Sequence, residues 1–431
     1  MDPPSHSRRS PPWYYGWNIV GVCVLSQVAV SGLTVGPFSL FLHGWSVQLH
    51  SPISTFTLGF SAFGLITALL APLAGVCADR YPSRYLFGGG LLVMALFCVA
   101  LSFATASWQI VVLYALPNSF AAAFAALIPA NAVVSRWFTR RLGLALGLTA
   151  LGQGLPGIIF PPIIAAVMPG LGWRMIWRIG GLVAGLIVLP VVFWVLRDRP
   201  AERDGATYLT SGGAAPLHHA HRGADLSWRD FLRRRNFWLL VAIFLVLIAG
   251  QLGTAPNLAP IIASHGLSEE DAGGLLALLN LSLLTSTLAV GMLSDRFGSR
   301  LPLVGLAFAS AAGSVLIAWG ASLPFIGLGT VFIGLSAGFW PLLATTAAAE
   351  FGVTNAGRAF GLVTSFLPLV ALAPFVIAKT EEATGSYVPG LSVLAVLSLL
   401  GGMAYLLLMR EPRSAEAVSA GRDGSGSALD G

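Results

Sequence analysis

Two short segments of the chain carry an acid and several arginines at matching positions. They read GVCADRYPSR from Gly75 to Arg84 and GMLSDRFGSR from Gly291 to Arg300, at a constant offset of 216 residues. A carboxylate and guanidinium groups at helix ends form charge-assisted contacts that can break and form again. These residue types are compatible with switchable contacts, and the simpler alternative is that the charges only stop transfer at a membrane surface. The residues concerned are Asp79, Arg80, Arg84, Asp295, Arg296 and Arg300.

A second group of polar side chains lies inside long apolar stretches, where an amide carries a free-energy cost unless it is paired. We expect such side chains to contact a bound solute or to join neighbouring helices, and the sequence favours neither role. Trp340 is added as a wall on which a solute could stack. The predicted solute-binding residues are Gln27, Asn118, Gln153, Gln251, Asn257, Asn280 and Trp340.

Two arginines stand near the end of another apolar stretch. Arg178 follows Arg174 by four residues, so both lie on one face of a helix and could receive an anion from outside. The competing interpretation is that they extend along the lipid toward the membrane surface.

The residues needed for other chemistry do not converge in the sequence. An enzyme would need a nucleophile, a base or metal ligands at matched spacing. Cys23, Cys77 and Cys98 all lie in or beside apolar stretches, and His218, His219 and His221 have no cysteine or acid at ligand spacing. We therefore expect no enzymatic activity, no cofactor and no metal, and the scattered arginines argue against nucleic acid as a partner.

The elements that must position these residues follow from composition. With 56% hydrophobic and 10% charged residues among 431, the chain has too little polar surface for a water-soluble protein of its size. Counting apolar runs long enough to cross a bilayer of about 30 Å predicts twelve transmembrane helices. Six lie within 17–196 and six within 237–409.

The basic residues give an independent test of that count. With the N-terminus inside, 21 of the 24 Lys and Arg residues fall on the cytoplasmic side, and a missed span would scramble this pattern. The sequence therefore predicts both termini in the cytoplasm. The other predicted segments are a cytoplasmic tail over 1–16, a cytoplasmic linker with a helix at the membrane surface over 197–236, and a tail over 410–431.

The repeated acid and arginine motif divides the chain into two similar halves. Two six-helix bundles joined by a long linker are typical of transporters whose halves rock about a site near the membrane midplane. We predict an all-α membrane protein of two pseudo-symmetric six-helix bundles.

The motif itself resembles the Gly-x-x-x-Asp-Arg-x-Gly-x-Arg signature of the major facilitator superfamily. Gly291, Asp295, Arg296, Gly298 and Arg300 match it fully, whereas the first copy has Pro82 in place of the second Gly. The resemblance implies that the six acid and arginine residues of the two motifs gate the cytoplasmic ends of the halves.

A narrower resemblance is to the bacterial monocarboxylate-transporter-like and oxalate/formate-exchanger-like branch. The segments that carry it are YYGWNIV, SRWFTRRLGLALGL, GLGWR and LSWRDFLRRRNFWLL. It implies an organic carboxylate anion carried across a bacterial inner membrane by alternating access. Members that handle monocarboxylates often have an arginine where this chain has Thr287, so the sequence departs from the pattern there.

Several alternatives stay open at this level. An uncharged cavity would suit efflux of amphipathic drug-like compounds, and a membrane-embedded sensor or enzyme is the alternative from another class. We expect a monomer that binds a small-molecule substrate and the lipid bilayer, with a coupled proton or a counter-transported anion as a further partner. No Asp, Glu or Lys lies inside the predicted spans, so proton coupling would have to use a helix end such as Asp79 or Glu350.

Overall fold

The computed structural model describes residues 14–138, 142–198, 228–320 and 322–409, apart from some side chains within helices such as those of Asp79 and Asp295. Residues 1–13 of the predicted N-terminal tail, the predicted C-terminal tail and most of the predicted linker therefore lie outside the described residues. Within the described ranges the regular structure is helical throughout. Lipid offers no water to backbone N–H and C=O groups, so a crossing segment must satisfy them within its own helix.

The first half forms one bundle. Its helices are α1 Gly16–Thr34, α2 Phe38–Leu49, α3 Ile53–Arg80, α4 Ser83–Ser102, α5 Ser107–Leu113, the π-helical turn η1 Tyr114–Asn118, α6 Ser119–Ala125, α7 Leu127–Trp137, α8 Leu142–Val183, the π-helical turn η2 Ala184–Val188 and α9 Leu189–Val195.

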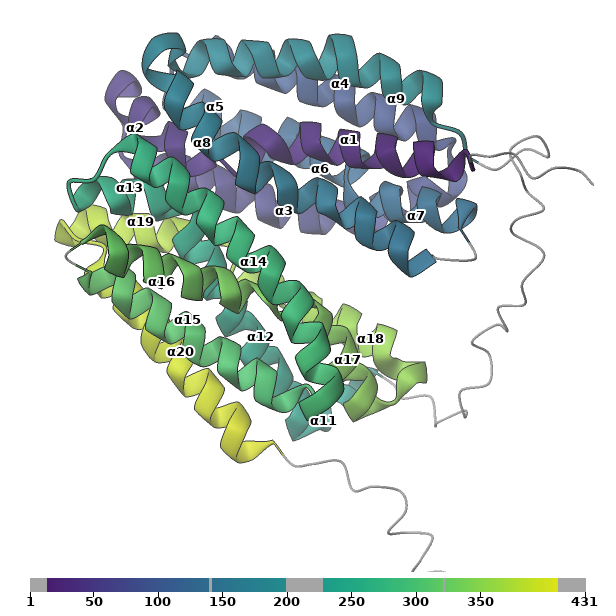
Figure 1. Ribbon diagram of the computed structural model, residues 1–431, viewed down its shortest axis with the longest axis vertical. Coiled ribbons are helices and arrows are strands. Elements are labelled where there is room, and N and C mark those ends of the chain that lie inside the picture. Colours follow the sequence, from purple (N-terminus) through teal and green to yellow (C-terminus); the bar gives the residue numbers. More distant parts are fainter. Residues whose placement is uncertain (1–13, 139–141, 199–227, 321, 410–431) are drawn as a thin grey trace, which may run out of the picture.

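The second half forms the other bundle (Figure 1). Its helices are α11 Trp228–Arg233, α12 Arg235–Thr254, η4 Ala255–Asn257, α13 Leu258–Ser264, α14 Glu269–Phe297, α15 Arg300–Trp319, α16 Leu323–Ser336, η5 Ala337–Phe339, α17 Trp340–Phe351, α18 Val353–Thr364, η6 Leu367–Leu369, α19 Ala373–Thr384 and α20 Val388–Leu408.

Twelve crossings result from these helices. Ten segments of the described chain are long and apolar enough to cross a membrane, and one of them, Leu144–Val195, runs for 52 residues. That segment reverses at Gly172, whose φ of 68° is readily open only to glycine, and so makes two crossings. The shorter apolar helix Leu323–Phe339 continues into α17 and completes the set. The predicted fold class is confirmed.

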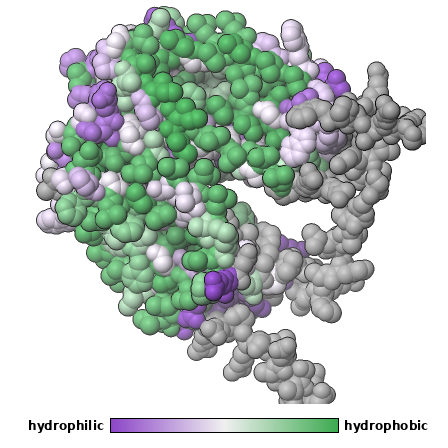
Figure 2. Space-filling model, viewed as in Figure 1, coloured by the Kyte–Doolittle hydropathy of each residue, from purple (hydrophilic) through white to green (hydrophobic). Residues whose placement is uncertain are grey.

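The two bundles meet at one end and separate at the other (Figure 1). At the end that we call the closed end, α2 packs on α13, α3 on α19 and α8 on α14. At the open end, α7 and α9 of the first bundle stand apart from α11, α17 and α18 of the second (Figure 1). A space-filling view shows the surface hollowed between the two halves on that side (Figure 2).

The buried side chains follow the same division. One apolar core runs through both bundles at the closed end and joins Phe41, Trp45 and Trp177 of the first half to Leu276 and Ile326 of the second. Toward the open end each bundle has a core of its own, one around Trp137 and the other around Phe237 and Tyr405. Motion that opens the closed end would have to separate a shared core.

Close helix contacts within a bundle depend on particular glycines. A Cβ at Gly334 in α16 would collide with the backbone carbonyl of Leu279 in α14, and one at Gly338 would collide with Ser286. Gly147 in α8 has nothing within 4 Å of such a Cβ. Gly334 and Gly338 therefore lie at tight helix contacts, whereas Gly147 faces open space.

We expect Gly334→Ala to lower the melting temperature of the detergent-purified protein, because overpacking a tight contact costs about 1–3 kcal/mol. Gly147→Ala is the matched control. It should leave the melting temperature unchanged or raise it, since alanine is favoured over glycine in a helix by up to about 1 kcal/mol. Equal melting temperatures for the two variants would contradict the tight contact between α14 and α16.

Candidate functional site

A cavity between the two bundles has the properties of a solute site. It has an open volume of about 620 Å³, which includes space continuous with solvent. Helix α3 contributes one wall and helices α12, α17 and the segment 367–374 contribute the other. The lining residues are Phe60, Gly64, Leu65, Ala68, Ile248, Gln251, Leu252, Trp340, Leu367, Pro368, Ala371 and Pro374.

Three crossings of the second bundle are interrupted where they reach this cavity. The first break is the 3-10 turn η4, one turn beyond Gln251, and the second is η5, directly before Trp340. The third covers residues 365–372, where η6 and turns separate α18 from α19. Pro256, Pro368 and Pro374 lie in or beside the breaks and cannot donate backbone hydrogen bonds. Non-helical backbone at membrane depth is tolerated where it lines a cavity or is buried in protein.

Two other hollows of the described structure are lined by a single bundle. One of about 890 Å³ lies among α1, α8 and η2 and has only apolar residues and glycines in its wall. The other, of about 670 Å³, lies between α4 and α9. A site that both halves can expose in turn must be lined by both halves, so the cavity between the bundles is the candidate.

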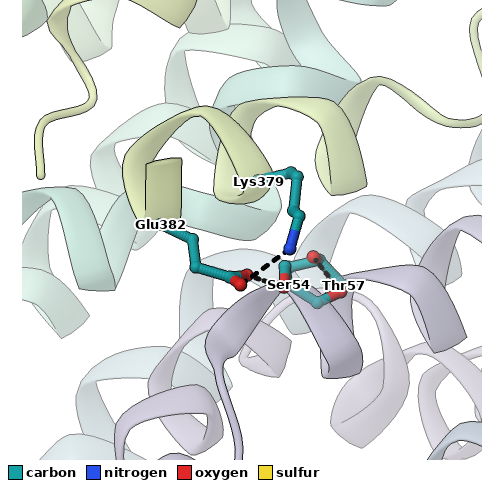
Figure 3. Close-up of polar contacts among 4 residues, drawn as sticks. All are labelled: Ser54, Thr57, Lys379 and Glu382. Carbon is teal, nitrogen blue, oxygen red and sulfur yellow. Dashed lines mark hydrogen bonds and ion pairs between the residues drawn. The ribbon is translucent and has the colours of Figure 1, made fainter. Parts of the chain in front are cut away.

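Hydrogen bonds reinforce the apolar contact at the closed end. Glu382 of α19 accepts one from the Ser54 hydroxyl of α3 at 2.5 Å (Figure 3). Lys379 donates to the other carboxylate oxygen of Glu382 at 2.7 Å and so holds the side chain in place. Ser54 is in the first turn of α3, where the helix dipole favours a negative charge. On the neighbouring seam, the Ala259 amide of α13 donates to the Ser39 hydroxyl of α2 at 2.6 Å.

The structure brings two of the seven predicted solute-binding residues to the cavity. Trp340 is 42% exposed and packs on one side against Phe339, with ring centroids 5.2 Å apart. Gln251 is half-buried, and among the described residues no hydrogen bond engages its side-chain amide. These two residues supply the polar atoms of side chains in the cavity lining.

Three of the other predicted residues lie at contacts between helices. Gln27 in α1 donates to the Thr149 carbonyl of α8 at 2.9 Å. Asn280 in α14 packs against Gly157 of α8, while its amide donates to the Leu276 carbonyl of its own helix at 2.8 Å. Asn257 donates to the Pro374 carbonyl at 3.0 Å and thereby ties two of the interrupted crossings together just behind the cavity. Helix pairing, one of the two roles expected from the sequence, is therefore what their contacts show.

Asn118 and Gln153 lie outside the cavity lining. Asn118 closes the π-helical turn η1 and is fully buried, with no hydrogen-bond partner for either amide atom in the described structure. Gln153 is an exposed residue of α8. Their predicted role in solute binding stays a prediction.

The two arginines predicted to receive an anion are engaged with the first bundle. Arg178 donates to the Ser102 hydroxyl at 3.2 Å, and Arg174 donates to the Ala104 carbonyl at 3.0 Å and to Gln48. A cation near the C-terminal end of a helix, here α4, complements its dipole. Their contacts account for both side chains without a ligand.

The motif arginines lie at the open end, and Arg300 donates a hydrogen bond within its own bundle. Arg300, the first residue of α15, donates to the Leu406 carbonyl near the end of α20 at 2.6 Å. Arg80 and Arg296 are exposed, and Arg84 is half-buried. The side chains of Asp79 and Asp295 lie outside the described residues. Gating by this group therefore stays a prediction.

Glu350 adds an acid to the second motif region. It accepts a hydrogen bond from Asn236 at 2.8 Å, which joins the end of α17 to the start of α12. Burial raises the pKa of the Glu350 carboxyl, while the Asn236 bond and the charge of Arg300 oppose that rise. This polar cluster stabilises the open end of the second bundle.

Sequence reasoning missed the contact between Ser54 and Glu382. Glu382 lies beyond the predicted end of its span, and Ser54 is one of many small polar residues in α3, so neither stands out in the chain. It also missed Phe60 and Gly64 of the cavity wall, because an apolar residue that faces a cavity looks like one that faces lipid. Pro368 and Pro374 were the sequence signal for the break between α18 and α19.

Comparison with known proteins agrees with this architecture. The family model of the Major Facilitator Superfamily matches residues 24–374 and 250–429. This chain belongs to the major facilitator superfamily. It is a multi-pass membrane transporter and not an enzyme, as the sequence predicted.

Relatives of this superfamily member are named as transporters of several kinds. An MFS-type transporter of Gibberella moniliformis is 25% identical over 95% of both chains. Monocarboxylate transporter 12 of Homo sapiens is 23% identical over 68% of this chain and 59% of the human one. The galacturonate transporter of Dickeya chrysanthemi is 23% identical over 52% of this chain and 64% of its own.

Solved structures share the fold of this major facilitator. A bacterial homologue of the human lysosomal transporter Spinster, in an inward-facing and unoccupied conformation, superposes with a TM-score of 0.68. The match covers 92% of this chain and 98% of that chain at 15% identity. The nucleoside transporter NupG gives a TM-score of 0.66 at 14% identity, over 91% of this chain and 98% of its own.

The closed end supplies a testable prediction about the conformation of this transporter. We expect Glu382→Gln to shift a fraction of the molecules toward a state with the closed end open, because a neutral amide oxygen is a weaker acceptor for the Ser54 hydroxyl than the carboxylate is. Spin labels at Val47→Cys of α2 and Ala383→Cys of α19, in a variant without the three native cysteines, would report the distance by electron paramagnetic resonance.

Glu381→Gln is the matched control for this measurement. It removes a carboxylate from the next position of α19, which has no described hydrogen bond to α3. The control should keep the distance distribution of the parent. Identical distributions for Glu382→Gln and the parent would show that the charge of Glu382 does not help to keep this end closed.

Proposed function

We propose that this chain is a secondary carrier that moves a small organic solute by alternating access, with the cavity between the bundles as its solute site. The observation that carries the proposal is that one core joins the bundles at the closed end, whereas separate cores and a hollow lie toward the open end. A rocking motion of the bundles about the cavity would separate them at the closed end and bring them together at the open end. The halves 17–196 and 237–409 would be the moving units.

We place the open end in the cytoplasm, so the described state is inward-facing. This orientation is supported by the excess of Lys and Arg on the side of both termini. The motif residues from Asp79 to Arg84 and from Asp295 to Arg300 would then meet when that side closes. A plasma membrane location fits a chain of this kind, and the bacterial inner membrane stays a prediction of the sequence.

The lining of the cavity bears on the class of solute. An organic carboxylate, the leading prediction from the family resemblance, would need a cation or several hydrogen-bond donors once removed from water. Among the described residues, the cavity lining includes no Lys, Arg or His, and Arg174 and Arg178 are held against α4. The cavity therefore favours the alternative, an uncharged or amphipathic compound. A coupled proton or counter-transported anion and a monomeric state stay predictions.

Gly64 offers a direct test of the proposed carrier. A Cβ at Gly64 would have nothing within 4 Å, so Gly64→Cys should place a thiol in the cavity without strain. In a variant that lacks Cys23, Cys77 and Cys98, we expect a membrane-impermeant maleimide to label Gly64→Cys faster in inside-out than in right-side-out vesicles. Combining it with Glu382→Gln should raise labelling from the outside.

Gly305→Cys is the matched control, since Gly305 of α15 is exposed, has equal free space and lies outside the cavity. It should face lipid and stay unlabelled from either side. Labelling of Gly64→Cys that is equal from both sides, or absent from both in parent and Glu382→Gln backgrounds alike, would overturn the proposal.

A further inference from the structure

The cavity presents one flat aromatic surface that is held in position. The Trp340 indole packs against Phe339 at a 30° tilt, and Phe244 meets it nearly edge-on at 75° with centroids 6.2 Å apart. These two contacts fix the indole, while 42% of the residue stays exposed and borders the cavity. Aromatic rings gain from offset stacking or edge-to-face contact beyond the area that they bury.

One neutral hydrogen-bonding group accompanies this surface. Gln251 offers a carbonyl acceptor and two N–H donors, and no described hydrogen bond uses them. It lies one turn before the break η4, on the same wall as Trp340. A solute that both donates and accepts along one edge would satisfy this amide in both directions.

The opposite wall leaves room for a flat molecule. On α3, Gly64 and Ala68 have little or no side chain, and Gly64 has nothing within 4 Å of an added Cβ. Phe60 lies one turn away and packs against Phe38 of the shared core, with ring centroids 4.5 Å apart and the rings tilted by 36°. The α3 wall is therefore apolar, has little side-chain volume at Gly64 and Ala68, and is held in place at Phe60.

We propose that the solute is an uncharged planar aromatic compound, whose ring lies against Trp340 and whose polar edge pairs with Gln251. This inference rests on the proposed carrier function and on the cavity as its solute site. A carboxylate on the same ring would be excluded, because the lining offers no cation to replace its hydration. A saturated ring of the same size would lose the stacking contribution.

Three matched probes separate these features: 2-naphthamide, 2-naphthoate and decahydronaphthalene-2-carboxamide. Each is tested for protection of Gly64→Cys from maleimide in the protein reconstituted in nanodiscs. We expect 2-naphthamide to protect at concentrations about twofold to tenfold lower than its saturated analogue, as an aromatic contact predicts. The carboxylate should give no protection in the same range.

Substitutions in the wall test the assigned residues. Trp340→Leu should make 2-naphthamide and its saturated analogue equally effective, whereas Trp194→Leu, at an 83% exposed position of α9, should leave their ratio unchanged. Gln251→Met keeps the size of the side chain and should weaken both amides by a similar factor. A ratio that is unaffected by Trp340→Leu would overturn the stacking assignment.

The outcomes distinguish this inference from the proposed function. If 2-naphthoate protects better than 2-naphthamide, or if no probe protects while labelling still depends on the side of the membrane, the solute class is wrong and the carrier function stands. If Gly64→Cys is labelled equally in inside-out and right-side-out vesicles, the proposed function is wrong, and this inference, which rests on it, is wrong as well.

Discussion

The lack of water in the bilayer is the constraint on which the structure depends. Each crossing must satisfy its own backbone, so long helices are the rule and an interruption needs protein or a cavity beside it. In the second bundle three interruptions, at 255–257, 337–339 and 365–372, gather around one cavity. Asn257 supports this arrangement, because its amide bonds the Pro374 carbonyl where two of the broken crossings meet.

The apolar core is shared by both bundles at the closed end and is divided between them at the open end. The shared core and the Ser54 to Glu382 hydrogen bond hold the closed end together. Separate cores around Trp137 and Phe237 let each bundle keep its shape when the open end changes. Packed interiors have discrete rather than continuous arrangements, which favours movement of whole bundles over local deformation.

Several charged side chains are engaged within their own bundle rather than in the cavity. Arg174, Arg178 and Arg300 each bond groups at or near helix ends of their own bundle, and Glu350 bonds Asn236 within the second. The cavity between the bundles is left with an amide and an indole as its polar side-chain groups. A neutral interior is consistent with a carrier whose site must be exposed to both sides without a large change in the solvation of fixed charges.

The sequence by itself determined the fold class, the twelve crossings and the family. Those features depend on the length of the apolar segments, on the side of the membrane where the arginines lie, and on the repeated motif from Gly291 to Arg300. Each of these is a local or periodic property of the sequence. Gln251 and Trp340, which line the cavity, were among its seven predicted solute-binding residues, but the sequence could not rank them. Only the tertiary structure decided that Gln27 and Asn280 lie at contacts between helices, that Arg174 and Arg178 are held at α4, and that Ser54 meets Glu382 from 328 residues away. The reason is physical: a side chain in an apolar helix faces lipid, another helix or a cavity according to how the bundle packs, and the helix sequence alone does not distinguish these surroundings.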